Sequence, residues 1–185
     1  MNLFFLHHRP DICAEYHCDK HVVKMIIEIV QMLYTAHLLL CSQNLPKDHY
    51  RKISTHMHPT AIWIRKRKEN YLYAAELACS IAYEYTRRYN RIHSCEKHAL
   101  WLKQNLPCFN NLCEKYKESV VFAFNKNLEA KGMTPVPLCM PSDCYLSDPI
   151  ESYRKYYKMY KAYFVRWKTR DVPSWFSFGD IRKYF

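Results

Sequence analysis

The sequence predicts an all-α protein: residues 1–185 are expected to form one compact domain, a bundle of about five helices with long loops. The first reason is composition, because only two residues are glycine, at positions 132 and 179, whereas an average chain of this length holds about a dozen. Small barrels and sandwiches depend on frequent glycine-containing turns. The second reason is periodicity, because the apolar residues of the long segments recur at three- and four-residue spacing.

Two long helices are expected in the first half of the chain. The first covers residues 11–40, with Asp11 as its cap and Asp19 as a point where it can kink. A polar loop rich in asparagine, proline, lysine and histidine separates it from the second helix, over residues 59–89. Pro59 opens that helix, since proline is favoured at the first helical position.

Shorter elements follow. A third helix is expected from residue 94 to the residue before the proline at 107, because a serine at 94 can cap it. Residues 111–131 are expected to form a fourth helix, closed by Gly132 in the conformation that helix ends favour. Three prolines make residues 133–147 an extended crossing.

The last helix has the clearest start. Residues 148–151 read Asp-Pro-Ile-Glu, an arrangement with an acidic cap, proline at the first position and glutamate at the third. Aromatic side chains then recur at helical spacing at Tyr153, Tyr156, Tyr157, Tyr160, Tyr163, Phe164 and Trp167. Packing on the core explains this stripe, and stacking on nucleic-acid bases is the alternative.

The same composition limits the function classes. Two glycines cannot supply G-x-G-x-x-G or G-x-x-x-x-G-K-[ST], so dinucleotide-binding and P-loop folds are excluded. None of the nine cysteines forms a C-x-x-C pair, which leaves reduced thiols, metal ligation and disulfides as alternatives. We expect no cofactor and no metal, because three ligands at successive helical turns are too widely spaced for one tetrahedral ion.

The charge balance indicates a partner. The chain has 28 lysines and arginines against 17 acidic residues, a net charge of +11, and 16% of its residues are aromatic. A basic, aromatic domain suits a phosphate-bearing partner, and double-stranded DNA is the partner we expect. A general solubility charge is the alternative. The absence of an apolar run of roughly 18 residues and of a signal-peptide pattern predicts a cytoplasmic protein, or a nuclear or virion one if viral, that is not secreted and has no membrane partner.

A line of polar residues on the first predicted helix is the candidate for catalysis. At 100° per residue, one narrow sector of the first helix holds Cys13, His17, His21, Lys24, Glu28, Gln31 and Thr35. The rest of that helix is apolar, so these groups are expected to face a pocket, since unpaired buried charges cost several kcal/mol. Acid, amine and imidazole together suit proton transfer. A buried ion-pair line between Lys24 and Glu28 is the alternative.

A second set of residues is expected to contact DNA. These residues are basic or polar and lie at the start and end of the second helix and on the last helix: His58, Arg65, Lys66, Arg67, Lys68, Asn70, Arg87, Arg88, Arg91, Arg154, Lys155 and Lys158. A solvated basic surface is the alternative reading of the same pattern.

Four local motifs resemble the pyrimidine dimer DNA glycosylase family, the phage endonuclease V type. They are Ala14-Glu15-Tyr16 on the first helix, Pro59-Thr60 opening a helix, the segment from Cys18 to Met25, and Asp148-Pro149 before the tyrosine-rich helix. The last two are most similar to the glycosylase-like proteins of phages and large viruses. The resemblance implies a compact all-α enzyme that flips a nucleotide and attacks its sugar C1′ with an amine.

The family's nucleophile is an α-amine at the amino terminus, whose ordinary pKa of about 7.7 to 8.0 leaves a neutral fraction. The family exposes a small residue after methionine removal, whereas Asn2 is large enough for Met1 to be retained. Met1, Lys20 and Lys24 are therefore all candidate nucleophiles. Asp19 and Glu28 are the candidate acids or charge stabilisers, and His21 is the candidate proton shuttle.

The resulting hypothesis is a DNA glycosylase with or without abasic lyase activity, acting on damaged or modified bases. Two other classes fit the same residues. One is a non-catalytic nucleic-acid-binding or virion protein, and the other is an enzyme directed at nucleotides that uses the same polar line.

Overall fold

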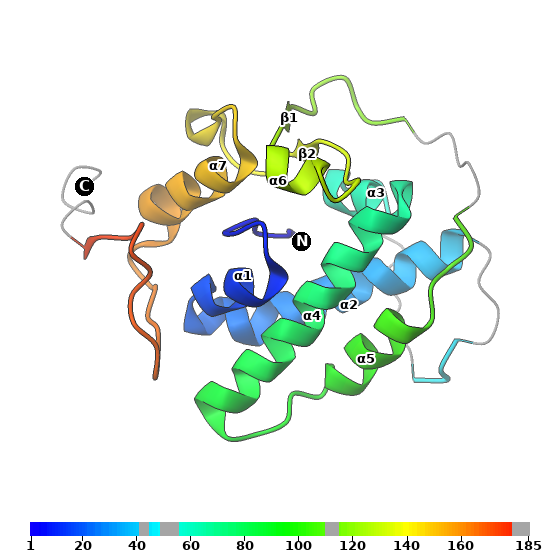
Figure 1. Ribbon diagram of the computed structural model, residues 1–185, viewed down its shortest axis with the longest axis horizontal. Helices are drawn as coiled ribbons and strands as arrows, with labels where there is room; N and C mark the ends of the chain where they lie inside the picture. Colours follow the sequence, from blue (N-terminus) through cyan, green and yellow to red (C-terminus); the bar gives the residue numbers. More distant parts are fainter. Residues whose placement is uncertain (41–44, 49–55, 110–114, 179–185) are drawn as a thin grey trace.

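The computed structural model describes four stretches of the chain, residues 1–40, 45–48, 56–109 and 115–178. Within them it contains seven α-helices and one two-stranded sheet (Figure 1). The prediction of an all-α fold is confirmed. The second glycine, at position 179, lies outside the described residues.

The predicted first helix is two helices. Helix α1 covers Pro10–Tyr16 and helix α2 covers Asp19–Leu39. Between them His17 and Cys18 have extended backbones, with ψ of 132° and 163°. Asp11 lies in the first turn of α1 and is not its cap; Arg9 holds that position.

Helix α2 is largely buried in the core. By length and composition it could cross a membrane. However, 67% of its most apolar stretch of 18 residues is buried inside the fold, as in the core helix of a globular domain. It packs along α4, which covers Lys68–Tyr89. Helix α3, Pro59–Lys66, precedes α4, and Arg67 separates the two with an extended backbone at φ −152° and ψ 147°.

Helix α5 covers Glu96–Gln104, inside the predicted range, but its cap position is held by Cys95 and not by the serine at 94. The predicted helix over residues 111–131 is wrong in the part that is described. There, β1 (Phe122–Ala123) pairs antiparallel with β2 (Val136–Pro137), and only α6, Lys126–Glu129, is helical.

Two local features explain that short helix. The side-chain oxygen of Asn125 accepts hydrogen bonds from the amides of Asn127 and Leu128, so the helix starts only there. Gly132 follows the helix with a φ of +82°, the left-handed backbone that favours glycine. Residues 133–147 run mostly extended, as predicted, with one 3₁₀ turn at Ser142–Cys144.

The last helix begins as predicted. Helix α7 covers Pro149–Tyr156 and continues as a π-type turn over Tyr157–Lys161. The carboxylate of Asp148 accepts the amide hydrogens of Ile150 at 2.7 Å and Glu151 at 3.2 Å. A side-chain cap of this kind contributes about 1 kcal/mol.

The amino-terminal segment fills the space that these helices enclose. Leu3, Phe4, Phe5 and Leu6 are all buried. The segment, dark blue in Figure 1, runs between α7 and the pair α2 and α4. The ring of Phe4 stacks on His21 of α2 at 4.5 Å, and the ring of Phe5 stacks on Tyr73 of α4 at 5.3 Å. Each such side chain contributes roughly 1.5–3 kcal/mol through burial, so the start of the chain is held firmly.

Candidate active site

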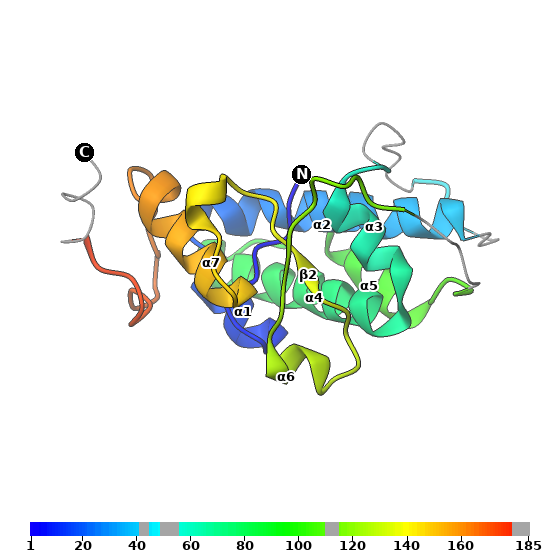
Figure 2. The same cartoon turned by 90° about the horizontal axis from the view of Figure 1, so that it is seen from above.

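The amino terminus lies beside the polar line of α2. The α-amino nitrogen of Met1 is 3.8 Å from Oε2 of Glu28. The Glu28 side chain is only 12% exposed. In Figure 2 the N-terminus lies at the same edge of the molecule as α2, while α1 and α6 lie toward the opposite edge. An amine and a carboxylate are thus brought together from positions 27 residues apart in the sequence.

Glu28 also has two further partners. The backbone amide of Asn2 donates to its Oε2 at 2.9 Å, and the ammonium of Lys24 is 3.6 Å from its Oε1. Lys24 is 71% exposed on its side chain, so its charge can reach a bound molecule as well as Glu28. The ion pair between Lys24 and Glu28, the alternative to a pocket in the sequence analysis, is present, but Lys24 lies at the surface and is not buried. The amino terminus joins the pair.

Asn2 fixes the direction of the first residues. Its side-chain amide donates to the carbonyl of Cys139 at 2.8 Å, and its side-chain oxygen accepts the hydroxyl hydrogen of Tyr153 at 3.0 Å. With the backbone bond to Glu28, three contacts from three different parts of the chain hold Asn2. No local pattern assigns this positioning role to Asn2; the four apolar residues that follow it are the signal that the segment is buried.

His58 and Cys139 complete the surroundings of the Met1 amine. His58 caps α3, its Nδ1 accepting the amide of Thr60 at 3.3 Å. Burial lowers the pKa of His58, the charge of the amino terminus lowers it further, and Glu28 opposes both. The imidazole is therefore neutral near pH 7, and its acceptor nitrogen is occupied by the Thr60 amide. Burial raises the pKa of Cys139, whose sulfur lies 3.3 Å from the Thr60 hydroxyl oxygen, so it stays a thiol.

The other imidazoles of the polar line face the core. His17 is fully buried, with Nδ1 2.7 Å from the carbonyl oxygen of Cys13. His21 is hydrogen-bonded through Nδ1 to the hydroxyl of Tyr157 and stacked on Phe4. Burial is the main cause that lowers the pKa of His17 to about 4 and that of His21 to about 3. Both rings are neutral at pH 7, and the predicted proton-shuttle role of His21 stays a prediction.

These histidines make stability depend on pH. An unfolded histidine has a pKa near 6.5. Below that pH the histidines of the unfolded chain bind protons, whereas the buried rings of the folded chain do not. The stability present above about pH 6.5 is then lost as the pH falls toward 4. Burial also lowers the pKa of His37 to about 4. At about 1.4 kcal/mol per pKa unit, we expect the three rings together to lower the free energy of unfolding by several kcal/mol between pH 7.5 and pH 4.5, measured as urea midpoints at the two pH values.

A matched pair of variants checks this assignment. His21→Gln should make the pH dependence shallower, because it removes one of the three buried rings with the most strongly lowered pKa, those of His17, His21 and His37, whereas His8→Gln, at a much less buried ring, should leave it nearly unchanged. Equal pH slopes in the wild type and His21→Gln would contradict it.

Asp19 and Lys20 lie at the start of α2, whereas Glu28 lies in its middle. Nine residues separate Asp19 from Glu28, about 13 Å along a helix. The Asp19 carboxylate accepts hydrogen bonds from Arg88 at 2.9 Å and from the backbone amide of Lys168 at 3.0 Å. The Lys20 ammonium lies 5.0 Å from the centre of the Phe164 ring. The structure therefore joins Met1, Lys24 and Glu28, and places Asp19 and Lys20 elsewhere.

The residues predicted to contact DNA divide by exposure. Three have enclosed side chains that do not reach the surface: Arg65, Asn70 and Arg88. Asn70 bonds to the Trp63 carbonyl and to Thr134, and Arg88 lies in a buried ion-pair network. His58 belongs to the amine site, which consists of Met1, Asn2, Lys24, Glu28, His58 and Cys139. Arg154 is half-buried and donates to the Leu6 carbonyl at 3.1 Å. Lys155 and Lys158 are half-buried, and the exposed members are Lys66, Arg67, Lys68, Arg87 and Arg91.

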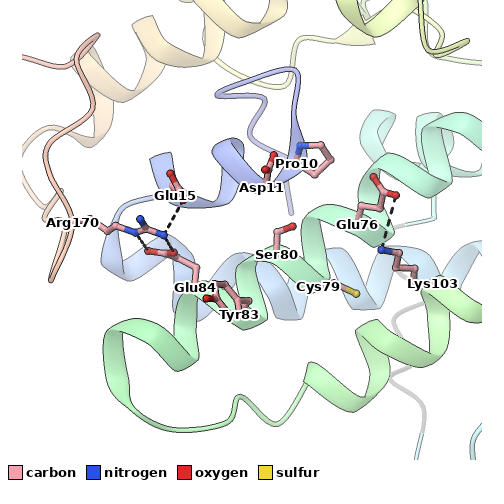
Figure 3. A pocket seen from close by; sticks show the side chains of 10 residues that line it. All are labelled: Pro10, Asp11, Glu15, Glu76, Cys79, Ser80, Tyr83, Glu84, Lys103 and Arg170. Atoms are coloured by element: carbon pink, nitrogen blue, oxygen red, sulfur yellow. Dashed lines mark hydrogen bonds and ion pairs between the residues drawn. The ribbon is translucent and has the colours of Figure 1, made fainter.

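A cavity of about 590 Å³ lies on another part of the molecule, between α1, α4 and α5 (Figure 3). Its walls carry four carboxylates, from Asp11, Glu15, Glu76 and Glu84, against the cations of Lys103 and Arg170. A wall with this excess of negative charge repels phosphate. The cavity is therefore a poor site for DNA, and none of its lining residues belongs to the amine site.

Within the described residues, no group of three or more histidine, cysteine or acidic side chains is arranged to hold a metal ion. The seven described cysteines carry free thiols. No family model, no curated protein and no solved structure matches the chain.

Proposed function

We propose that the protein is a DNA glycosylase with abasic lyase activity, acting on a damaged or modified base through the α-amine of Met1. The observation that carries this proposal is the 3.8 Å separation between that amine and the carboxylate of Glu28. A nucleophile beside a group that can take and return protons is the usual arrangement for covalent catalysis. The net charge of +11 supports a polyanionic substrate.

The chemistry assigns each group a step. The neutral amine forms a bond to C1′ of the target nucleotide while the glycosidic bond breaks, and the base leaves with the bonding electrons and takes a proton. Loss of a proton from nitrogen and opening of the sugar ring give an imine. Removal of a proton from C2′ then expels the 3′ phosphate, and water releases the enzyme.

Glu28 is the proposed proton carrier and the counter-charge for the cationic sugar. Its carboxylate is close to the amine and largely withdrawn from water, which strengthens its interaction with a developing positive charge. The ammonium of Lys24, exposed and beside Glu28, is placed to meet a phosphate. Neutral His58 adds no positive charge beside the amine.

Borohydride trapping tests the proposal. Reduction of an imine gives a stable protein–DNA adduct, so we expect an adduct with duplexes that contain an abasic site, or with ultraviolet-irradiated duplexes. Peptide mapping should place the DNA on the α-nitrogen of Met1. An adduct on Lys20 or Lys24 would overturn the assignment of the nucleophile.

Two other outcomes discriminate between the functional classes. No adduct and no strand cleavage, together with salt-dependent DNA binding that survives Lys24→Ala with Glu28→Ala, would make the protein a non-catalytic DNA binder. Binding of a free nucleotide with no affinity for duplex DNA would indicate a nucleotide-directed enzyme. Both results contradict the proposed mechanism.

A further inference from the structure

Two adjoining cavities lie where the C-terminal segment crosses the start of α2. One, of about 430 Å³, is lined by Asp19, Lys20, Tyr163, Phe164 and Arg166. The other, of about 480 Å³, shares Asp19 and Arg166 and adds Trp167, Lys168, Val172 and Phe178. Because they share two residues, we treat them as one feature, the double cavity. None of its residues contacts the amine of Met1.

The double cavity combines positive charge with aromatic surface. Lys20, Arg166 and Lys168 are exposed cations on its walls. Its one carboxylate, on Asp19, is already bonded to Arg88 and to the Lys168 amide. The balance of charge toward a ligand is therefore positive, unlike that of the acidic cavity in Figure 3.

The aromatic rings differ in availability. Phe164 has Lys20 over one face at 5.0 Å, and its ring meets that of Tyr163 edge to face at 4.9 Å. Tyr163 is 73% exposed, so its ring offers a free surface for stacking. Aromatic rings next to cations are what single nucleotides of a strand bind, with the base on the ring and the phosphate on the cation.

We propose that the double cavity binds one nucleotide unit of the DNA strand that the amine site acts on, with its base stacked on Tyr163 and its phosphate held by Lys20 and Arg166. The identity of the strand rests on the proposed function. The spacing fits, because Lys20 lies eight residues before Glu28 on α2, about 12 Å along the axis. At 3.4 Å per nucleotide along a duplex strand, the bound unit is about three or four nucleotides from the reacting one.

Binding of an undamaged oligonucleotide tests the cavity without needing any imine. With a fluorescein-labelled ten-residue thymidine oligonucleotide, we expect Tyr163→Ala combined with Arg166→Ala to weaken binding about ten-fold or more, since one stacked base alone contributes about 1–3 kcal/mol. The matched control is Tyr83→Ala combined with Lys103→Ala, at the acidic cavity, which should stay within about two-fold of the wild type.

Three results decide the matter. Equal oligonucleotide binding by the wild type and the Tyr163/Arg166 variant overturns the proposal, whatever the trapping assay shows. Displacement of the oligonucleotide by free thymidine monophosphate at a similar concentration also overturns it, because the ligand is then a mononucleotide. Weakened binding without any borohydride adduct in the wild type supports the cavity while rejecting the glycosylase mechanism.

The number of nucleotides that flank the abasic site tests the distance between the amine site and the double cavity. On abasic oligonucleotides with five flanking nucleotides on each side, the Tyr163/Arg166 variant should need about ten-fold more DNA for half-maximal trapping. With a single flanking nucleotide on each side, the variant and the wild type should behave alike. A defect that persists on the short substrate would contradict the assigned distance.

Discussion

Replacing Glu28 with glutamine is expected to lower the rate of imine trapping, and of strand cleavage, by a factor of about 100 or more. General acid–base groups contribute roughly 10²–10⁴ to enzymatic rates. The glutamine keeps an oxygen that can accept the amide of Asn2, which bonds to Glu28 at 2.9 Å in the structure. It removes the charge and the capacity to carry a proton. Single-turnover trapping on an abasic duplex measures the effect.

The matched control is Glu129→Gln, an exposed glutamate on α6, which should trap at the wild-type rate. A two-residue extension before Met1 provides an independent check, because it moves the α-amine away from Glu28 and should abolish the adduct. If the extended protein still traps at the normal rate, the nucleophile is a lysine. If Glu28→Gln traps at more than about a third of the wild-type rate, Glu28 is not the proton carrier.

The starts of α3 and α7 could be predicted because their causes are local. Pro59 and the Asp148-Pro149 pair set the first turns of α3 and α7 through chain stiffness and side-chain caps. The break at Arg67 could not be predicted, since four basic residues and the glutamate after them suit a continuous helix. The helix predicted over residues 111–131 failed because the two-residue strand at Phe122–Ala123 pairs with residues that come 13 or more positions later.

The site could be predicted only in part. The polar line on α2 correctly brought Lys24 and Glu28 together, because helical spacing alone fixes that pair. It also included His17, which the break before α2 turns into the core. The approach of Met1 to Glu28 depends on burial of residues 3–6 between α7 and α2, a tertiary contact that no local pattern encodes. Asp19 is bonded to Arg88, 69 residues away, for the same reason.

Replacement of Arg88 is expected to destabilise the fold. Arg88→Leu is expected to lower the free energy of unfolding by about 3–5 kcal/mol, the usual cost of removing one partner from a buried ion pair. The guanidinium donates to Glu84 at 2.6 Å, to Asp19 at 2.9 Å and to two backbone carbonyls. Burial raises the pKa of Glu84, but bonds from Arg170 and Arg88 outweigh it and hold the pKa below its usual value. Urea unfolding at pH 7 measures the loss.

Arg87→Leu is the matched control, because the neighbouring side chain is exposed and surface changes usually stay within about 0.5 kcal/mol. Arg88→Lys should restore little, since an ammonium cannot reproduce the planar fork that reaches four acceptors. If Arg88→Leu does not fold, Arg170→Leu gives a milder test at a partly exposed member of the same network, 2.7 Å from Glu84. Losses below about 1 kcal/mol in both leucine variants would show that the network does not hold α1, α2, α4 and the C-terminal segment together.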